Sequence, residues 1–153
     1  MDYTATELRF LNGTSIELTF LDGKIIQFDV SKLFDRYPQF KKLQNDRSLF
    51  VKGKLWPLGE VIYWDDEIEL DTIWVYQEGT VIGYNEPSLK QKIALLLSKT
   101  REDSKLTQTQ LSKLSGIDQG DISRIERGLG NPTLHKIEKL FNSLGKSLEI
   151  NVK

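Results

Sequence analysis

The spacing of apolar residues changes once along this chain, near residue 87. Before that point, apolar and polar residues alternate in short runs, which is typical of strands with one buried face. The alternation predicts strands near residues 5–11, 14–21 and 24–30. The apolar residues expected on their buried face are Leu8, Phe10, Ile16, Leu18, Phe20, Ile26, Phe28 and Val30. The dipeptides between these runs, Asn12-Gly13 and Asp22-Gly23, favour tight hairpin turns because these residue types tolerate a positive φ. We therefore expect a three-stranded antiparallel meander.

The rest of the first half contains only short segments whose pattern indicates secondary structure. Strand-like or ambiguous segments lie at Phe50-Val51, at residues 61–64, and at residues 71–77, which fit either a short helix or a strand. We interpret residues 1–80 as a small α+β domain built on an antiparallel sheet. The stretch 78–87 contains two glycines and a proline, so it predicts a linker, which we place at 81–87.

From Pro87 onward, apolar residues recur every three or four positions, which is the period of an amphipathic helix. Helices are expected over 88–104, from Thr107, over 119–127 and from Thr133. Thr107 and Gln110 have the spacing of a capping box, and Gly116 is expected to close the helix that Thr107 begins. The final residues, 146–153, alternate again and predict a strand that pairs with its copy in a second subunit or docks on the N-terminal sheet.

Composition narrows the chemistry that these 153 residues can support. The chain has no Cys and a single His, His135, so disulfides, thiolate nucleophiles and Cys-ligated zinc are excluded. We therefore expect no enzymatic activity, no cofactor and no metal. No apolar run approaches the ~20 residues of a membrane span, and the first residues lack the pattern of a signal peptide. These features predict a cytoplasmic protein with no membrane partner.

The net charge of −1 conceals an asymmetry between the two halves of the chain. Residues 1–86 carry nine basic and fifteen acidic side chains, a net charge of −6. Residues 87–153 carry twelve basic and seven acidic side chains, a net charge of +5. The two halves are therefore expected to be modules with different partners, and the basic half suits a polyanion such as DNA.

Residues 88–145 resemble the Cro/C1-type helix-turn-helix family, also called XRE. The resemblance rests on Gln108, Leu111, the Gly116-Ile117 turn, the run ISRIERG at 122–128, Asn131-Pro132-Thr133 and Leu144-Gly145. It implies an all-α, lambda-repressor-like DNA-binding domain, so the predicted fold class of the whole chain is α+β. It also implies that Arg101 and Glu126 form a structural ion pair between the first helix and the recognition helix.

A helix-turn-helix places the start and the outer face of its second helix in the major groove. On 119–127, the outward positions are Gln119, Gly120, Ser123, Arg124 and Arg127. Gln can pair with adenine and Arg with guanine, whereas Gly120 offers no side chain where many relatives read a base. Asp121 either brings a negative charge near the DNA or serves the helix cap. The resemblance places Gln108 at a phosphate and against the first recognition residue, and further candidates for backbone contacts are Thr107, Thr109, Lys113 and Asn131.

These features predict a sequence-specific regulator of double-stranded DNA, and specifically a dimeric repressor whose two half-sites lie about one helical turn apart. One alternative is an antitoxin that represses its own operon and binds a toxin through residues 1–86. Its contact surface would be an acidic face on an extended segment, formed by Asp65, Glu67, Glu69 and Asp71. The basic partner of this face is either a toxin or the protein's own DNA-binding surface. Another alternative is a small-ligand-binding or enzymatic N-terminal domain with an accessory DNA-binding module. The N-terminal part is similar to a small bacterial domain family of unknown function, which implies no particular chemistry.

Overall fold

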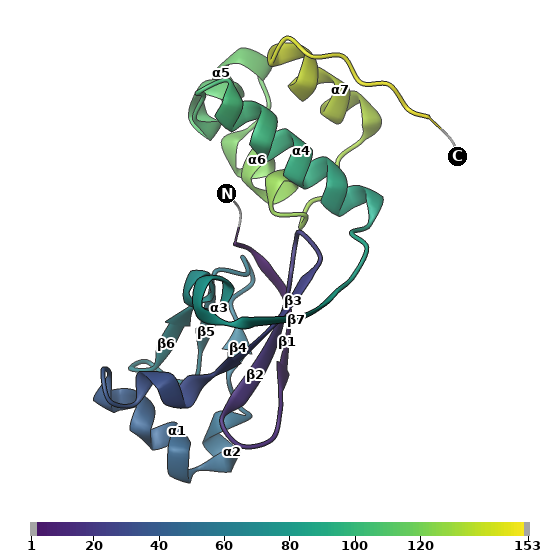
Figure 1. Ribbon diagram of the computed structural model, residues 1–153. Coiled ribbons are helices and arrows are strands. Elements are labelled where there is room, and N and C mark those ends of the chain that lie inside the picture. Colours follow the sequence, from purple (N-terminus) through teal and green to yellow (C-terminus); the bar gives the residue numbers. More distant parts are fainter. Residues whose placement is uncertain (1–2, 152–153) are drawn as a thin grey trace. The chain divides into compact units, whose positions relative to one another are not determined.

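The alternating residues at the start of the chain form an antiparallel meander, as the sequence predicts. The computed structural model describes residues 3–151 and places the meander in β1 (Ala5–Phe10), β2 (Ser15–Phe20) and β3 (Lys24–Asp29) (Figure 1). Contacts divide the chain into two compact units between Glu86 and Pro87. An antiparallel sheet in the first unit and helices in the second confirm the predicted α+β class.

The turn between β2 and β3 requires glycine. Gly23 has a φ of +93°, which other residues rarely adopt. A Cβ atom at this position would also collide with the backbone oxygen of Asn85, because the Asn85 N–H donates to the Gly23 carbonyl at 2.7 Å. The glycine therefore allows the chain that follows the first sheet to pass close to the hairpin.

The predicted linker at 81–87 is wrong for its first residues, because Thr80–Tyr84 form a fourth strand, β7, beside β3. The sheet order is β1-β2-β3-β7, so β7 pairs on one side only. Glycine weakens a strand at its centre, but a strand at the edge tolerates it, and the β-branched pair Val81-Ile82 favours the strand. The two glycines and the proline of this stretch therefore did not mark a linker along its whole length.

Short helices and a second sheet complete the first unit. Phe50 ends a helix and Val51 lies in the turn after it, so the strand predicted there is wrong. The strand predicted at 61–64 is confirmed as β5, and the ambiguous stretch 71–77 becomes the helix α3. The second sheet has the order β4-β5-β6. The bounds of these elements are η1 (Val30–Leu33), η2 (Pro38–Lys41), α1 (Lys42–Asn45), α2 (Arg47–Phe50), β4 (Lys54–Leu55), β5 (Val61–Tyr63), β6 (Glu69–Asp71) and α3 (Thr72–Glu78).

The acidic segment is not extended, which corrects the single strand face predicted for its carboxylates. Residues 64–67 bend between β5 and β6. The Asp65 carboxylate accepts hydrogen bonds from the backbone N–H groups of Glu67 and Ile68, both at 2.9 Å, which stabilises the bend. Glu67 pairs with Lys42, whereas Glu69 and Asp71 lie on β6. Two of the four carboxylates therefore lie in a bend and two on a strand, so they do not form one strand face.

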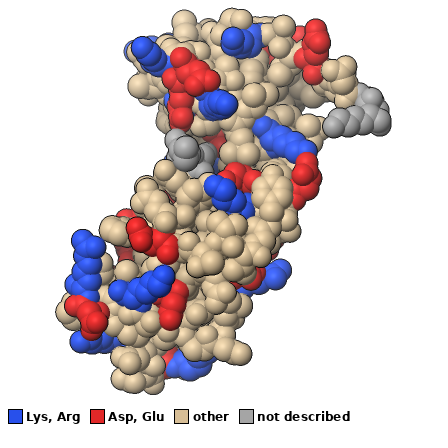
Figure 2. Space-filling model, viewed as in Figure 1, with Lys and Arg blue, Asp and Glu red and all other residues tan. Residues whose placement is uncertain are grey.

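Basic and acidic side chains are interspersed over the surface in the view of Figure 2. Neither unit shows one continuous area of a single sign on this face. No helix among residues 3–151 is long and apolar enough to cross a membrane.

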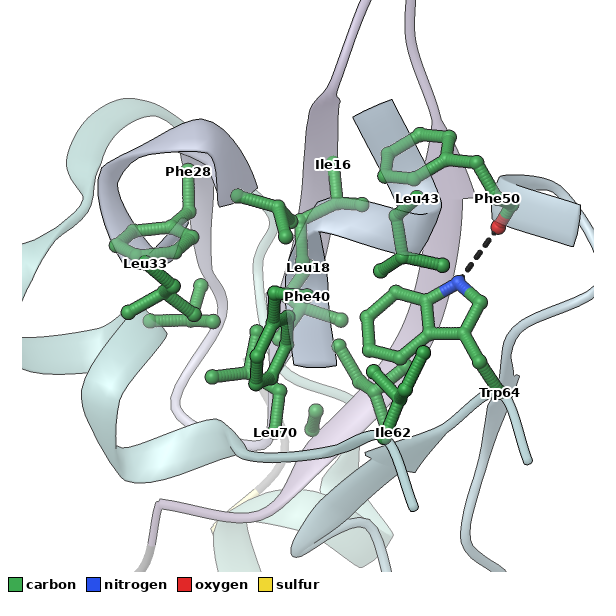
Figure 3. Packing of buried hydrophobic residues seen from close by; sticks show 14 of the residues in the cluster. Ile16, Leu18, Phe28, Leu33, Phe40, Leu43, Phe50, Ile62, Trp64 and Leu70 are labelled. Carbon is green, nitrogen blue, oxygen red and sulfur yellow. Dashed lines mark hydrogen bonds between the residues drawn. The ribbon is translucent and has the colours of Figure 1, made fainter. Parts of the chain in front are cut away.

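The core of the first unit lies between the sheets and the short helices (Figure 3). Of the inward residues predicted for the meander, Leu8 and Phe10 pack against this core and are partly buried, and the others are buried within it, namely Ile16, Leu18, Phe20, Ile26, Phe28 and Val30. Trp64 belongs to this core, and its ring stacks on Phe50 with centroids 6.3 Å apart. Its indole N–H donates to the Phe50 carbonyl at 2.7 Å, which satisfies two buried polar groups at once.

The described part of the second unit, residues 87–151, contains four helices at the predicted positions. Their bounds are α4 (Leu89–Asp103), α5 (Gln108–Ser115), α6 (Gln119–Glu126) and α7 (Leu134–Ser143). The Thr107 hydroxyl accepts from the Gln110 N–H at 3.1 Å while the Gln110 side chain accepts from the Thr107 N–H at 2.8 Å. This is the predicted capping box. Gly116 ends α5 in the left-handed conformation at a φ of +66°, which turns the chain toward α6.

The strand predicted for residues 146–153 is not formed in the single chain. Residues 146–151 have no secondary structure, and 152–153 lie outside the described residues. Leu148 and Ile150, two apolar residues of the predicted pattern, are exposed. A lone strand needs a partner for its backbone groups, and the described part of this unit contains only helices.

Replacing Trp64 by Phe tests the hydrogen bond at the core of the first unit. The variant keeps an aromatic ring but removes the short hydrogen bond to the buried Phe50 carbonyl, which retains only the longer one from the Gly53 N–H at 3.4 Å. We expect the free energy of unfolding to fall by about 1–3 kcal/mol, measured by urea denaturation followed by far-UV circular dichroism. Trp56→Phe is the matched control because Trp56 is exposed. An equal loss in both variants would contradict this role of the indole N–H.

Candidate nucleic-acid interface

The helix α6 buries one face and exposes the other. Ile122 and Ile125 belong to the helical core, whereas Gln119, Gly120 and Arg124 are exposed. Ser123 and Arg127 are partly buried, and the Arg127 Nε–H donates to the Ser123 hydroxyl at 3.3 Å. The five side-chain positions predicted to face outward therefore all remain at the surface, although two of them are engaged with each other.

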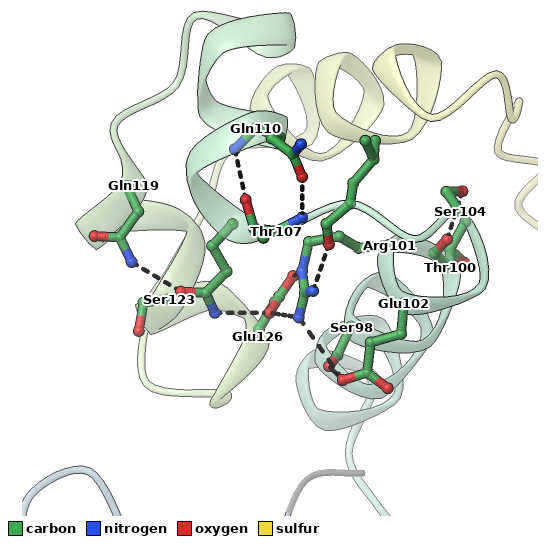
Figure 4. Close-up of polar contacts among 12 residues, drawn as sticks. Ser98, Thr100, Arg101, Glu102, Ser104, Thr107, Gln110, Gln119, Ser123 and Glu126 are labelled. Carbon is green, nitrogen blue, oxygen red and sulfur yellow. Dashed lines mark hydrogen bonds and ion pairs between the residues drawn. The ribbon is translucent and has the colours of Figure 1, made fainter.

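A buried carboxylate connects α6 to the rest of the unit (Figure 4). The side chain of Glu126 is only 2% exposed and accepts two hydrogen bonds from Arg101 of α4, Nε to Oε1 at 2.7 Å and Nη2 to Oε2 at 2.8 Å. The Arg101 Nη1 group also donates to the Leu106 carbonyl at 2.8 Å. This is the ion pair that the resemblance implies, and it joins α4, the loop after α4 and the end of α6.

A second set of hydrogen bonds runs from this carboxylate to the start of α6. The Gln108 side chain, at the first position of α5, donates from Nε2 to Glu126 Oε2 at 2.8 Å. Its Oε1 atom accepts from the Gln119 Nε2 group, also at 2.8 Å. We call the four residues Arg101, Gln108, Gln119 and Glu126 the Glu126 network. Within it, Gln108 holds the first residue of α6, as the resemblance implies.

The Glu126 network fixes which atoms of Gln119 remain available. One N–H of its amide is used by Gln108, and the second N–H and the Oε1 atom have no partner within residues 3–151. An adenine needs one donor and one acceptor from a glutamine, to its N7 and N6 groups. The hydrogen bond to Gln108 is therefore compatible with paired contacts to a base.

The negative charge of Asp121 is paired with a residue that the sequence did not indicate. Asp121 is the third residue of α6, but the cap hydrogen bond comes from Asp118, whose carboxylate accepts from the Gly120 N–H at 2.8 Å. Asp121 instead accepts from the Lys136 ammonium of α7 at 2.6 Å, which holds the pKa of this carboxyl below its usual value. The contact balances a negative charge beside the exposed face of α6. Fifteen positions separate the two residues, so no local pattern indicated the pair.

The residues predicted to contact the DNA backbone lie on two elements. Thr107, Thr109 and Lys113 are exposed at or near α5, and Thr109 and Lys113 share one helix face because they are four positions apart. The Thr107 oxygen accepts the cap hydrogen bond, which leaves its O–H able to donate outward. Asn131 is exposed in the loop after α6. Exposed hydrogen-bond donors thus lie both before α6, on α5, and after it, in the loop that follows.

Comparisons with known proteins give likenesses for both units. Residues 97–151 match the helix-turn-helix family, and residues 5–79 match a family of proteins of unknown function (DUF2442). An uncharacterised helix-turn-helix-type transcriptional regulator of Haemophilus influenzae is 39% identical over 72 residues, which cover 44% of this chain and 74% of that protein. The crystal structure of a candidate DNA-binding protein from Nitrosomonas europaea has a TM-score of 0.43 and 14% identity, over 90% of this chain and 83% of that one.

Replacing Arg101 by Met tests the buried ion pair. The variant leaves the Glu126 carboxylate without its main partner, so we expect the free energy of unfolding to fall by about 3–5 kcal/mol in urea denaturation. Lys99→Met, on the exposed side of α4, is the control. The double variant Arg101→Met/Glu126→Met is expected to recover much of the loss because no unpaired charge remains. A double variant as unstable as the single one would contradict this explanation.

Proposed function

Because the chain belongs to the Cro/C1-type helix-turn-helix family of DNA-binding transcriptional regulators, we propose that it is a repressor that occupies a specific operator as a homodimer. The observation that carries the proposal is the hydrogen bond from Gln119 to Gln108, which itself donates to the buried Glu126. A base-reading side chain held in one orientation loses less conformational entropy when it binds. The Glu126 network thus supports a preorganised reading surface.

The roles proposed for the residues of α6 follow from their chemistry. Gln119 reads an adenine, and Arg124, which is exposed on the same helix, reads a guanine through two donors. Ser123 and Arg127 contact either a base edge or a phosphate. Gly120 adds no contact but lets the backbone approach the groove. Direct readout therefore depends on few side chains, and sequence-dependent DNA shape supplies the remaining specificity.

Backbone contacts position the protein on the duplex. We assign these contacts to Gln108, Thr107, Thr109, Lys113 and Asn131. Only Lys113 among them carries a charge, and its neutralisation of a phosphate releases a counterion. The others donate hydrogen bonds, which fix register without adding to the salt dependence.

Repression is proposed to arise from occupancy alone, with no reaction catalysed. Two copies on two half-sites about one helical turn apart block the access of polymerase to the promoter. The tail at 146–153 remains a predicted dimer contact, because a ribbon between two tails needs a second copy of the chain. A two-fold dimer is the commonest symmetric assembly of soluble proteins.

The structure of the first unit favours neither alternative function. The acidic face required by the antitoxin alternative is divided between a turn and β6. A cavity beside Tyr37 and Trp74 has a volume of only about 190 Å³. Small-molecule sites are usually clefts of about 300–1,000 Å³, so this cavity gives little support to a ligand-binding role.

Arg124→Ala tests the proposed base contact. We first select bound duplexes from a random pool with the full-length protein, which defines the operator and its half-site spacing. The variant is then expected to bind that operator about 5- to 150-fold more weakly, the equivalent of about 1–3 kcal/mol. It should also lose its preference at one base pair of each half-site. An unchanged selected sequence would contradict the assignment of Arg124 to a base.

Lys113→Ala tests the proposed phosphate contact. Its affinity should fall by a similar factor on every duplex, and the slope of log affinity against log salt should decrease by about one per subunit. Lys99→Ala is the control because Lys99 is an exposed lysine of α4 that we assign no DNA contact. Equal salt slopes in all three proteins would show that Lys113 meets no phosphate.

A further inference from the structure

The two edges of the first sheet differ in how they are protected. At the β1 edge, Glu7 and Arg9 are exposed charged residues, and the backbone N–H of Ala5 donates to the Gly59 carbonyl at 2.7 Å. Exposed charges and a covering loop are two common means of preventing another strand from pairing with an edge. The β1 edge therefore has the features of a protected edge.

The opposite edge of the sheet lacks both exposed charged residues and a covering loop among the described residues. We call the outer side of Thr80–Tyr84 the β7 edge; its sequence, TVIGY, contains no charged residue and no proline. No strand within residues 3–151 pairs with it. Val81, Ile82 and Tyr84 are 58%, 48% and 62% exposed. An apolar edge with free backbone groups favours pairing with a further strand.

The apolar inner face of the sheet continues onto this strand without a cover. Val81 pairs with Ile26, which is fully buried, and Tyr84 pairs with Lys24. Directly paired residues of an antiparallel sheet have side chains on the same face. A register shift between Ile25 and Ile26 leaves Ile82 as an extra residue on β7, so Val81 and Tyr84, although three positions apart, both lie on the face that forms the core. Both are nevertheless more than half exposed. A neighbouring strand would extend the sheet and place its own side chains beside Val81 and Tyr84, which would reduce their exposure.

We propose that the β7 edge pairs with the β7 edge of a second copy of this chain, antiparallel and about a two-fold axis. This inference rests on the proposed homodimer and assigns it a contact surface. A two-fold contact brings the residues near its axis against their own copies, so a charge there would meet a like charge. The β7 edge is free of charge and therefore self-complementary. Pairing also supplies partners for its unpaired backbone groups.

The size of this contact indicates a weak dimer that DNA strengthens. Five residues from each copy bury less surface than the about 1,200–2,000 Å² of a stable interface. Two operator half-sites hold the two copies together, which makes the second contact effectively intramolecular. The β7 edge is therefore expected to contribute chiefly to cooperative binding at a two-half-site operator.

The length of the chain between the units is compatible with this arrangement. With the two-fold axis at Ile82, the two Tyr84 residues lie about 14 Å apart. The chain from Tyr84 to Leu89, the first residue of α4, spans at most about 18 Å in each copy. The two α4 helices can therefore start up to about 50 Å apart, which includes the about 34 Å between half-sites one helical turn apart.

Val81→Lys tests the proposal because a lysine at an exposed edge adds a like charge from each copy. Sedimentation velocity over a range of concentrations is expected to show an about tenfold or greater rise in the dimer dissociation constant. Cooperative binding to the selected two-half-site operator should fall, while binding to a duplex with one half-site is unchanged. Val51→Lys, the same substitution at an exposed valine outside the sheet edges, should behave as the wild type. Far-UV circular dichroism verifies that each variant is folded.

The outcomes separate this inference from the proposed function. A dimer that is unaffected by Val81→Lys overturns the β7 edge contact but leaves the repressor proposal standing. If Ile150→Lys alone abolishes that dimer, the tail is the contact instead. A wild-type chain that selects no sequence from the duplex pool overturns the proposed function, whatever its oligomeric state. A wild-type chain that stays monomeric even on the two-half-site operator overturns the β7 contact directly.

Cysteine cross-linking gives a second, independent test because the chain contains no cysteine. Single cysteines at Thr80, Val81, Ile82 and Tyr84 are oxidised with copper phenanthroline, and covalent dimers are measured on denaturing gels. Facing residues of an antiparallel pair have Cα atoms about 4.5–5.5 Å apart, which a disulfide can span. We expect cross-linking to be strongest at the position nearest the axis and absent for Glu7→Cys on β1. Equal cross-linking at both edges would overturn the proposal.

Discussion

The carboxylate of Glu126 is the group on which the arrangement of the second unit depends. A charge that is 98% buried is tolerated only when hydrogen bonds replace its hydration, and here Arg101 and Gln108 supply them. These partners come from α4 and α5, while the carboxylate itself lies on α6. Any shift of one helix against the others would leave the charge unpaired, so the Glu126 network fixes the relative positions of three helices more specifically than apolar packing alone can do.

The same network connects stability to the proposed function. Gln108 uses one end of its amide to satisfy Glu126 and the other to hold Gln119 at the exposed start of α6. The orientation of a base-reading side chain is thus set from inside the unit, before any DNA is bound. The pair of Asp121 and Lys136 acts on the same surface in a different way, because it offsets a carboxylate that would otherwise repel phosphates.

The first unit illustrates how local signals succeed and fail. Alternation and the two turn dipeptides predicted the meander and its inward residues, because both signals act within a few positions. The strand β7 was missed because Gly79 before it and Gly83 within it resemble a linker, and only its pairing with β3 makes it a strand. The acidic segment was predicted as extended, but Asp65 folds it into a turn through its own neighbours' N–H groups. Phe50 was assigned to a strand although it ends a helix that buries it beneath Trp64.

The sequence alone therefore determined the two-part α+β organisation, the positions of the four C-terminal helices and the outward residues of α6. Those features follow from periodicity, helix capping and the family resemblance, all of which can be read along the chain. The tertiary structure alone decided the Lys136 partner of Asp121, the dual use of Gln108 and the exposed β7 edge. These depend on which distant residues meet, and no spacing along a single chain encodes a contact made between separate elements.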